Sequence, residues 1–175
     1  VLNQLYKGTP LQDSFGYNMV SLVDGVPRTL NLAEMIGYYL DHQMEVIERR
    51  TQFRLDQAEA RAHILEGLII AVDNIDEVIK IIRGSQDTAE ARSNLIERFD
   101  LSEIQANSIL DMPLRRLTAL EVDKLRTELA ELQETIAKLK AILADADRRW
   151  SIIRDELTAV KEKFGEARRS RLITD

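Results

Sequence analysis

Apolar residues in the C-terminal part of the sequence recur in alternating steps of three and four positions. One series comprises Val122, Leu129, Ile136, Leu143, Trp150, Leu157 and Phe164, and the other comprises Leu125, Leu132, Leu139, Ala146, Ile153 and Val160. Together they form an a/d heptad pattern over about six heptads, which keeps one stripe facing a partner helix. A single helix cannot bury this stripe by itself. The pattern therefore predicts a partner, which is another copy, another protein or an earlier segment of this chain.

An earlier segment of the chain also has the pattern of a long helix. Residues 31–62 contain no Pro and only one Gly, Gly37, and their apolar residues recur mostly at helical spacing. Asn31 and Glu34 have the spacing of a capping box, which marks the start of a helix. The segment predicts an outgoing arm that spans roughly 45 Å. In residues 1–30, Asp24-Gly25 lies between two apolar runs, which predicts a short β-hairpin.

Residues 63–117 have the pattern of several short helices. Capping boxes are predicted at Asp87 with Glu90, Ser102 with Gln105 and Thr118 with Glu121, with a weaker one at Asn74 with Glu77. Gly84 and Pro113 are stop signals. Together these signals predict helices over about 63–73, 75–83, 88–98 and 103–111. Rich in Ile and Leu, these helices can enclose a small globular tip.

A long helix is predicted to return from Thr118 to residue 144. Asp145 and Asp147 interrupt it, because Asp is a poor interior residue but a good N-cap, and a separate helix is expected over about 147–164 within residues 145–175. Two arms joined through one tip lie antiparallel. Leu129, Ile136 and Leu139 are therefore expected to pack against the stripe of residues 36–58. The predicted fold is mainly α: an antiparallel two-helix coiled-coil arm with a small helical tip and an N-terminal β-hairpin.

Composition supports this fold and limits the possible functions. Of 175 residues, 31% are charged and 5% aromatic, which suits long solvated helices. The net charge of −6 argues against a protein that binds nucleic acid over its whole surface. With no Cys, the chain has neither disulfides nor thiolate metal sites. No apolar run reaches transmembrane length and no signal peptide is evident. Because Val1 begins within folded sequence, we expect the chain to be a fragment.

Candidate chemistry is sparse. His42 and His63 lack metal-ligand spacing, and no phosphate-binding loop, Ser/His/Asp set or HExxH motif is present. Arg49, Arg50 and Arg54 form a basic cluster for which salt bridging to neighbouring helices is the simpler interpretation. Contact with a DNA backbone is the alternative, and it would be weak and non-specific. No residue is assigned as catalytic, cofactor-binding or metal-binding.

The tip has more apolar residues than four short helices need internally. These residues surround Pro113 and comprise Ile104, Ile109, Leu110, Met112, Leu114 and Leu117. Such a surplus is typical of an interface, and two-fold symmetry lets one stretch supply both sides. We therefore predict a homodimer through residues about 100–117. The alternative is that these residues only close the tip's own core.

Six stretches in collinear order carry a resemblance to a known family. They are LYKGTPLQDSFGYNMVSLVDGVPRTLNL, RRTQFRL, RAHILEGL, NIDEVIKIIR, QANSILDMPLRRLTALE and EKFGEARRSRL. The chain resembles the A subunit of bacterial DNA gyrase, one of the type II topoisomerases, over its whole length. The resemblance implies that residues 1–30 end a tower domain, 31–62 and 118–144 form the arm, and 63–117 form the dimerisation tip of an exit gate for DNA. Residues 145–175 would then pack back toward the tower and form a C-terminal tail.

The resemblance also implies partners and cofactors outside this chain. In that family, two A and two B subunits pass one DNA duplex through a break in another, and the B subunits bind ATP and magnesium, in the cytoplasm. The catalytic tyrosine would lie upstream of Val1, because none of Tyr6, Tyr17, Tyr38 and Tyr39 lies in a matching motif. We therefore expect this chain to be inactive alone. A domain that wraps DNA would begin beyond Asp175.

Alternatives remain open at the level of the sequence. The A subunit of topoisomerase IV, a decatenating paralogue, shares the arm and tip, although RLTALE and FGEARRSRL favour gyrase. A non-enzymatic coiled-coil spacer and a stand-alone DNA-binding module are two further readings. The hairpin argues against the spacer, and the acidic balance argues against the DNA-binding module.

Overall fold

The computed structural model describes residues 1–171 and 173, and the chain forms two compact units, Val1–Glu45 and Val46–Asp175. The last part of the predicted C-terminal tail, residues 172, 174 and 175, lies outside the described residues. The first unit contains α1 (Leu2–Gly8) and an antiparallel hairpin of β1 (Val20–Val23) and β2 (Val26–Thr29). Asp24 and Gly25 turn the hairpin with φ of 52° and 78°, the positive values that a two-residue turn of this kind requires. The predicted hairpin is confirmed.

The helix α2 (Leu32–Asp73) begins in the first unit and continues into the second. Its start is fixed by the predicted capping box. The Glu34 amide donates to Asn31 Oδ1 at 2.9 Å, and the Asn31 amide donates to Glu34 Oε2 at 2.8 Å. The prediction that residues 63–73 form a separate helix was wrong. Between residues 62 and 73 the sequence contains no Pro, and its one glycine, Gly67, is buried within the helix.

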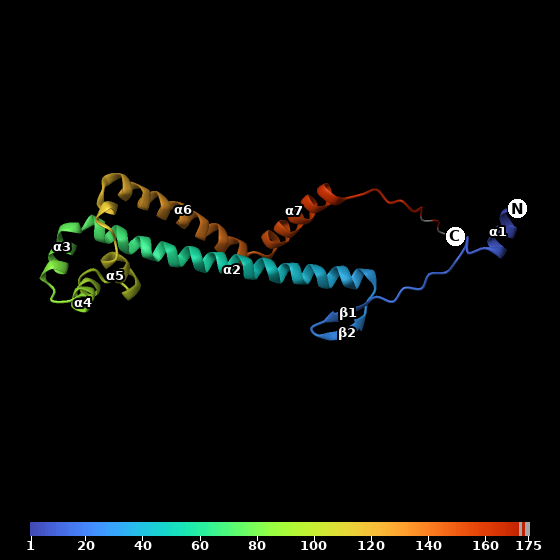
Figure 1. Ribbon diagram of the computed structural model, residues 1–175, viewed down its shortest axis with the longest axis horizontal. Coiled ribbons are helices and arrows are strands. Elements are labelled where there is room, and N and C mark those ends of the chain that lie inside the picture. The colour runs from blue at the N-terminus through green and yellow to red at the C-terminus, as the bar shows by residue number, and fades with distance from the viewer. Residues whose placement is uncertain (172, 174–175) are drawn as a thin grey trace. The chain divides into compact units, whose positions relative to one another are not determined.

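Three short helices and a 3-10 turn form the tip (Figure 1): α3 (Ile75–Gly84), α4 (Thr88–Phe99), α5 (Glu103–Leu110) and η1 (Leu114–Leu117). Asp87 caps α4 by accepting from the Glu90 amide, and Ser102 and Gln105 form the reciprocal box that begins α5. The core of the tip consists of buried residues from α2, from the tip helices and from the start of the return helix. They are Leu65, Leu68, Ala71, Val78, Leu95, Leu101, Ile109 and Leu125.

Two predicted capping boxes are absent for a local reason. Only Asn74 separates α2 from α3, and its side-chain amide donates to the Ile70 carbonyl, so it satisfies the end of α2 instead of the start of α3. The Thr118 hydroxyl donates to the Arg115 carbonyl of the preceding 3-10 turn. In both cases the polar side chain donates a hydrogen bond to a carbonyl of the preceding element, so it does not cap the helix that follows.

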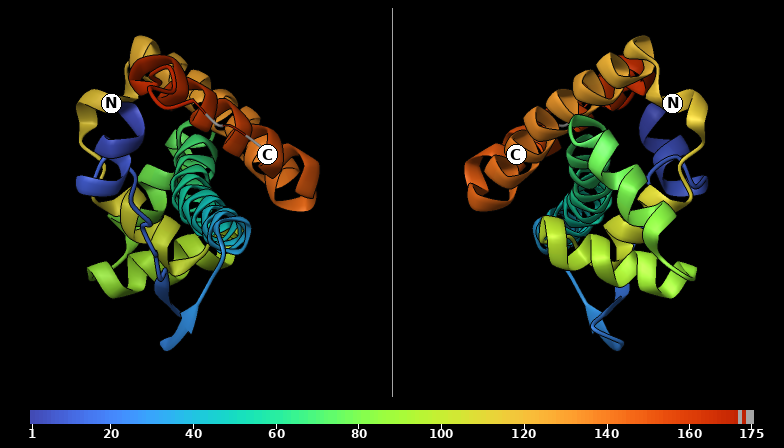
Figure 2. Two further views of the ribbon diagram at one scale, coloured as in Figure 1. Left: turned by 90° about the vertical axis from the view of Figure 1, so that its right-hand side faces the viewer. Right: turned by 90° about the vertical axis from the view of Figure 1, so that its left-hand side faces the viewer.

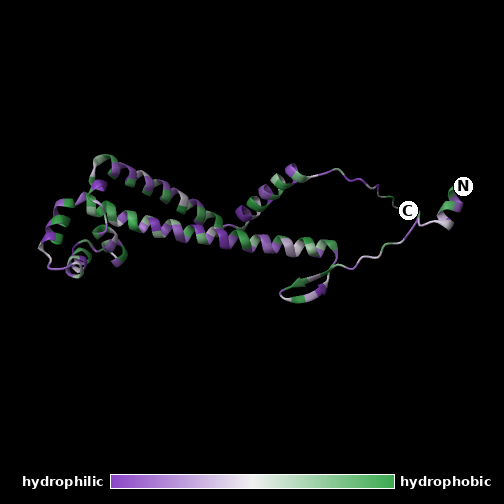
Figure 3. Cartoon of the chain, in the orientation of Figure 1, coloured by the Kyte–Doolittle hydropathy of each residue, from purple (hydrophilic) through white to green (hydrophobic). Residues whose placement is uncertain are grey.

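The returning side of the arm consists of α6 (Ala119–Ala144) and α7 (Ala146–Phe164), which meet at Asp145 as predicted. Figure 1 shows α6 running beside α2, and the end-on views of Figure 2 place α6 and α4 on different sides of α2. Polar and apolar residues alternate along both long helices (Figure 3), which is the pattern of helices with one apolar face. Leu125, Leu139 and Ile153 of the stripe are buried, whereas Val160 and Phe164 near its C-terminal end are exposed. The predicted mainly α fold with a short N-terminal hairpin is confirmed.

The predicted register of this pairing was wrong. Arg126 pairs with Asp73 at 2.6 Å and Lys140 with Glu59 at 2.7 Å, which aligns α6 with the tip-side part of α2 rather than with residues 36–58. Leu129 and Leu132 accordingly pack against the tip core. Residues near Glu48 face α7 instead, through an ion pair with Arg149 at 3.1 Å.

Candidate functional site

The surface of the tip exposes large apolar side chains on three consecutive elements. Ile104 on α5 is 61% exposed and Leu114 on η1 is 81% exposed. Leu120, in the first turn of α6, is 68% exposed and was missed from the sequence, because it precedes the heptad series. Water contact of this extent is unfavourable for three large aliphatic side chains so close in sequence.

The other four residues predicted for the interface have different surroundings. Ile109 is 4% exposed and belongs to the core of the tip. Leu110 and Met112 are half-buried and pack against that core, and Leu117 is also half-buried. Of the six predicted residues, Ile104 and Leu114 are therefore the ones with most surface left to cover.

A cleft of about 330 Å³ opens beside Met112, between α2 and the loop that follows α5. Ile64 and Leu68 of α2 form an apolar wall of the cleft. The positively charged side chains of Arg61 and Arg116 also line it. Pro113, which directly precedes the exposed Leu114 in the sequence, also lines the cleft.

The helix α5 is fixed to α2 through a polar contact that the sequence did not reveal. Gln105, 6% exposed, donates from Nε2 to the His63 carbonyl at 2.7 Å, and the Ser102 hydroxyl lies 2.7 Å from His63 Nε2. A Cβ on Gly67 would lie 2.7 Å from Gln105 Cβ, so α5 packs directly on the backbone of α2. The one feature of the sequence that could have indicated this contact is Gly67, because a glycine inside a helical pattern often marks the close approach of another element.

An ion pair joins α6 to α2 just beyond the tip. Arg61 donates to both Glu128 oxygens, from Nε at 2.7 Å and from Nη2 at 3.0 Å. These hydrogen bonds hold the pKa of the Glu128 carboxyl below its ordinary value of 4.5 and raise the pKa of Arg61. Both side chains are about 40% exposed, so water screens the pair.

The basic cluster on α2 makes an ion pair within the chain. Arg50 donates to Glu156 of α7 at 2.6 Å, which matches the simpler interpretation of this cluster. Arg49 and Arg54 are exposed. A DNA contact at these positions stays a prediction.

Neither a membrane-spanning helix nor a metal cluster occurs among the described residues. No helix in this part of the chain is long and apolar enough to cross a membrane. Within the same residues, no group of three or more His, Cys, Asp or Glu side chains is arranged to hold a metal ion.

Comparison with known proteins identifies the family. Residues 1–158 match the family described as the A subunit of DNA gyrase/topoisomerase IV. The chain belongs to this family. It is 55% identical over 170 residues to the DNA gyrase A subunit of Clostridium acetobutylicum, an alignment that covers 97% of this chain and 20% of that protein. Identity to the DNA gyrase A subunit of Halalkalibacterium halodurans is 58% over 170 residues, with the same coverage of each chain.

A third relative, the DNA gyrase A subunit of Mycolicibacterium smegmatis, is 55% identical over 173 residues, which cover 99% of this chain and 20% of that protein. The chain thus spans about a fifth of the length of the gyrase A subunits that it matches. All three relatives are named as gyrase subunits, which favours gyrase over topoisomerase IV. Family membership also favours the topoisomerase reading over the spacer and the stand-alone DNA-binding module.

Proposed function

We propose that this chain is the arm and the exit-gate dimerisation tip of a gyrase-type A subunit. The observation that carries the proposal is the exposure of Ile104 and Leu114 on a tip whose own core is already closed. Family membership supplies the context, because a gate between two A subunits requires a surface on each that binds its copy.

The packing of the tip suits an interface that separates and re-forms. Residues such as Leu65 and Leu95 are fully buried, at 0% exposed, so the core does not depend on a partner. Two-fold symmetry would place the exposed residues of both tips face to face, and the half-buried Met112 beside them is a flexible side chain that adapts to either state. The tip can then part from its copy without unfolding.

In the whole enzyme, this gate would release a DNA duplex that has passed through a double-strand break in another duplex. We place the tyrosine chemistry elsewhere in the full-length A subunit. ATP and magnesium belong to the B subunit, within an A2B2 complex of the cytoplasm. The reaction proposed for the whole enzyme is ATP-dependent negative supercoiling, with decatenation as the alternative if the chain derives from topoisomerase IV. The chain alone is expected to lack DNA cleavage activity.

The decisive experiment measures solution mass against concentration for the wild-type chain and for Leu114→Asp. We expect the wild type to approach the mass of a dimer as concentration rises. Leu114→Asp should stay monomeric with unchanged helical content, because a charge would have to be desolvated at the interface. Ile104→Asp should behave in the same way.

Val160→Asp is the matched control, because Val160 is a β-branched aliphatic residue, 52% exposed, on α7. It should dimerise like the wild type. A wild type that stays monomeric at all concentrations would support the spacer reading. A Leu114→Asp variant that still dimerises would move the interface to another part of the tip.

A further inference from the structure

The junction between α6 and α7 is formed by a single residue, Asp145. Its backbone is extended, with φ of −126° and ψ of 113°, between the last residue of α6 and the first of α7. Helix breaks of this kind usually occur at Pro or Gly. Residues 119–164 contain neither, and Asp145 has an alanine on each side. Covalent structure therefore does not force the helix to break here.

The sequence on both sides of the junction also suits one continuous helix. Leu139, Ala146 and Ile153 follow one another in steps of seven, so the apolar series crosses Asp145 without a change of phase. A helix that ran straight through would keep these residues on a single stripe. The only local feature against it is the modest preference of Asp for caps over helix interiors.

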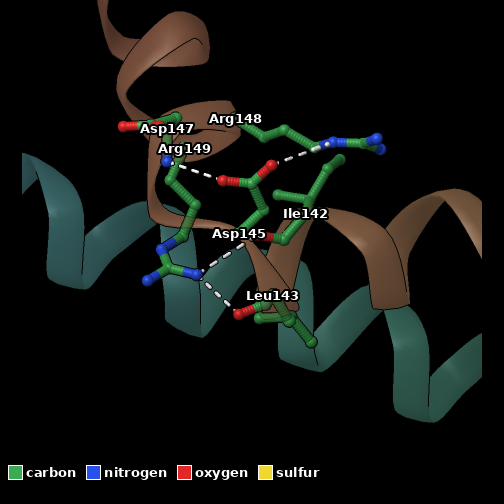
Figure 4. Close-up of polar contacts among 6 residues, drawn as sticks. All are labelled: Ile142, Leu143, Asp145, Asp147, Arg148 and Arg149. Atoms are coloured by element: carbon green, nitrogen blue, oxygen red, sulfur yellow. Dashed lines mark hydrogen bonds and ion pairs between the residues drawn. The ribbon is translucent and has the colours of Figure 1, made fainter.

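Three side chains make polar contacts at the junction (Figure 4). Arg148 Nε pairs with Asp145 Oδ2 at 3.3 Å, and the other two, Asp145 and Arg149, bond to backbone groups that the break leaves open. Asp145 Oδ1 accepts from the Asp147 amide at 2.9 Å, as an N-cap. Arg149 points back from α7 to the last turn of α6, where its Nη1 donates to the Ile142 carbonyl at 3.2 Å and to the Leu143 carbonyl at 2.5 Å. In a continuous helix these carbonyls would accept from backbone amides four residues on, so the guanidinium replaces bonds that the break removes.

The broken form is incompletely satisfied even with these contacts. Arg149 also pairs with Glu48 of α2, its side chain is only 14% exposed, and its Nε is buried with no partner among the described residues. Two backbone bonds at the junction are long: Asp145 N to Ile142 O and Arg149 N to Asp145 O, both at 3.4 Å. An unpaired buried donor and weak bonds both reduce the advantage of the broken form.

We propose that the Asp145 junction is a two-state joint in the returning side of the arm. In one state α6 and α7 are separate helices, held by Asp145 and Arg149. In the other they form one continuous helix, in which neither side chain has a capping role. The helix α2 has no break opposite the junction and supports the arm in both states. The proposal does not depend on whether the tip dimerises.

The two states differ in the distance between α6 and α7, which spin labels can measure. The chain has no Cys, so Ala130→Cys and Ala159→Cys, both at exposed positions, provide a unique label pair. In a continuous helix these positions would be about 44 Å apart along the axis. Dilution with unlabelled chain removes distances between copies. Helical content, measured by circular dichroism, is the second readout.

Asp145→Ala and Arg149→Gln should both shift the joint toward the continuous helix, because each removes a contact that only the broken form makes. We therefore expect the distance to lengthen and helical content to rise. Ala146→Pro should lock the broken form, since Pro is favoured at the first helical position and holds the residue before it extended. Added to Arg149→Gln, it should restore the wild-type distance. Arg154→Gln, which alters an exposed arginine elsewhere on α7, should change neither readout.

If Arg149 only stabilises the fold, its replacement should lower helical content instead of raising it. If Arg149→Gln and Asp145→Ala lower helical content or broaden the distance without lengthening it, the two-state joint is wrong. The proposal is equally overturned if Ala146→Pro fails to reverse the effect of Arg149→Gln. These outcomes are independent of solution mass, so they do not bear on the proposed gate.

Discussion

Gly67 lies inside a helix, where alanine would ordinarily be more favourable by about 1 kcal/mol. At this position alanine should instead be destabilising, because its Cβ would lie 2.7 Å from both Cβ and Cγ of Gln105, close to the backbone of α5. We expect Gly67→Ala to lower the free energy of unfolding by about 1–3 kcal/mol, the usual cost of overpacking. Urea denaturation followed by circular dichroism measures it. Gly37→Ala, in the same helix with no atom within 4 Å of its Cβ, should be neutral or stabilising. Equal effects at both sites would contradict the close packing.

The Arg61–Glu128 pair predicts a dependence of stability on pH. Because the pKa of Glu128 is lowered in the folded state, its contribution is present above its ordinary pKa of 4.5 and is lost as pH falls through the folded value. Glu128→Gln should therefore cost less than about 1 kcal/mol at pH 7, since the pair is exposed, and nothing at strongly acidic pH. Thermal unfolding of both proteins across pH 2–8 tests this, with the exposed Glu131→Gln as control. A difference from wild type that persists unchanged in acid would show that the loss is not electrostatic.

At the scale of the elements, α6 is not equally buried along its stripe. Leu139 is 9% exposed, whereas Ile136 is half-buried and lines a groove of about 600 Å³ between α2 and α6 with Ala62. A carboxylate at position 136 can reach the water of the groove, but one at position 139 cannot. We therefore expect Leu139→Asp to cost several kcal/mol and Ile136→Asp clearly less. Urea denaturation of both variants checks the order, and an equal loss would show that the groove is closed in solution.

The elements themselves were largely predictable from the sequence, and their pairing was not. Local signals identified the Asp24-Gly25 turn, the caps at Asn31 and Ser102 and the break at Asp145, because each depends on residues within a few positions. The register of α6 on α2 depends on contacts between distant residues, such as Lys140 with Glu59. A heptad stripe offers several registers that bury the same kind of side chain, so periodicity alone cannot choose among them.

The candidate site was predictable only in part, for the same reason. The cluster around Pro113 correctly indicated an apolar part of the tip, but Ile109 turns into the core and Ile104 turns out to solvent. That division depends on how α5 is seated on Gly67 by Gln105, a contact between residues far apart in the sequence. The role of Arg149, whose Nε is buried, could not be predicted either, because two adjacent arginines in a charged helix are usually both solvated.

At the scale of the whole molecule, charge limits what the chain can do with DNA. A net charge of −6 repels a polyanion, so any attraction must come from a local basic cluster, and the one predicted to contact DNA is on α2. Arg50, which donates to Glu156, is half-buried, whereas the side chains of Arg49 and Arg54 are exposed to solvent. A short duplex should therefore bind weakly, without sequence preference, and only at low salt.

The slope of binding against salt tests this prediction. Each phosphate contact contributes about 0.9 to the slope of log affinity against log salt concentration, because a counterion is released. Replacing both Arg49 and Arg54 with Gln should lower the slope by about two, whereas the same replacement of the exposed tip residues Arg83 and Arg115 should leave it unchanged. Fluorescence anisotropy over a salt series measures all three proteins. Affinity that depends on sequence, or that salt does not weaken, would mean that the chain reads DNA through contacts other than phosphate neutralisation. A slope that falls equally in both double variants would instead place the attraction in the charge of the whole chain, and the arm would then carry no DNA-contacting cluster of its own.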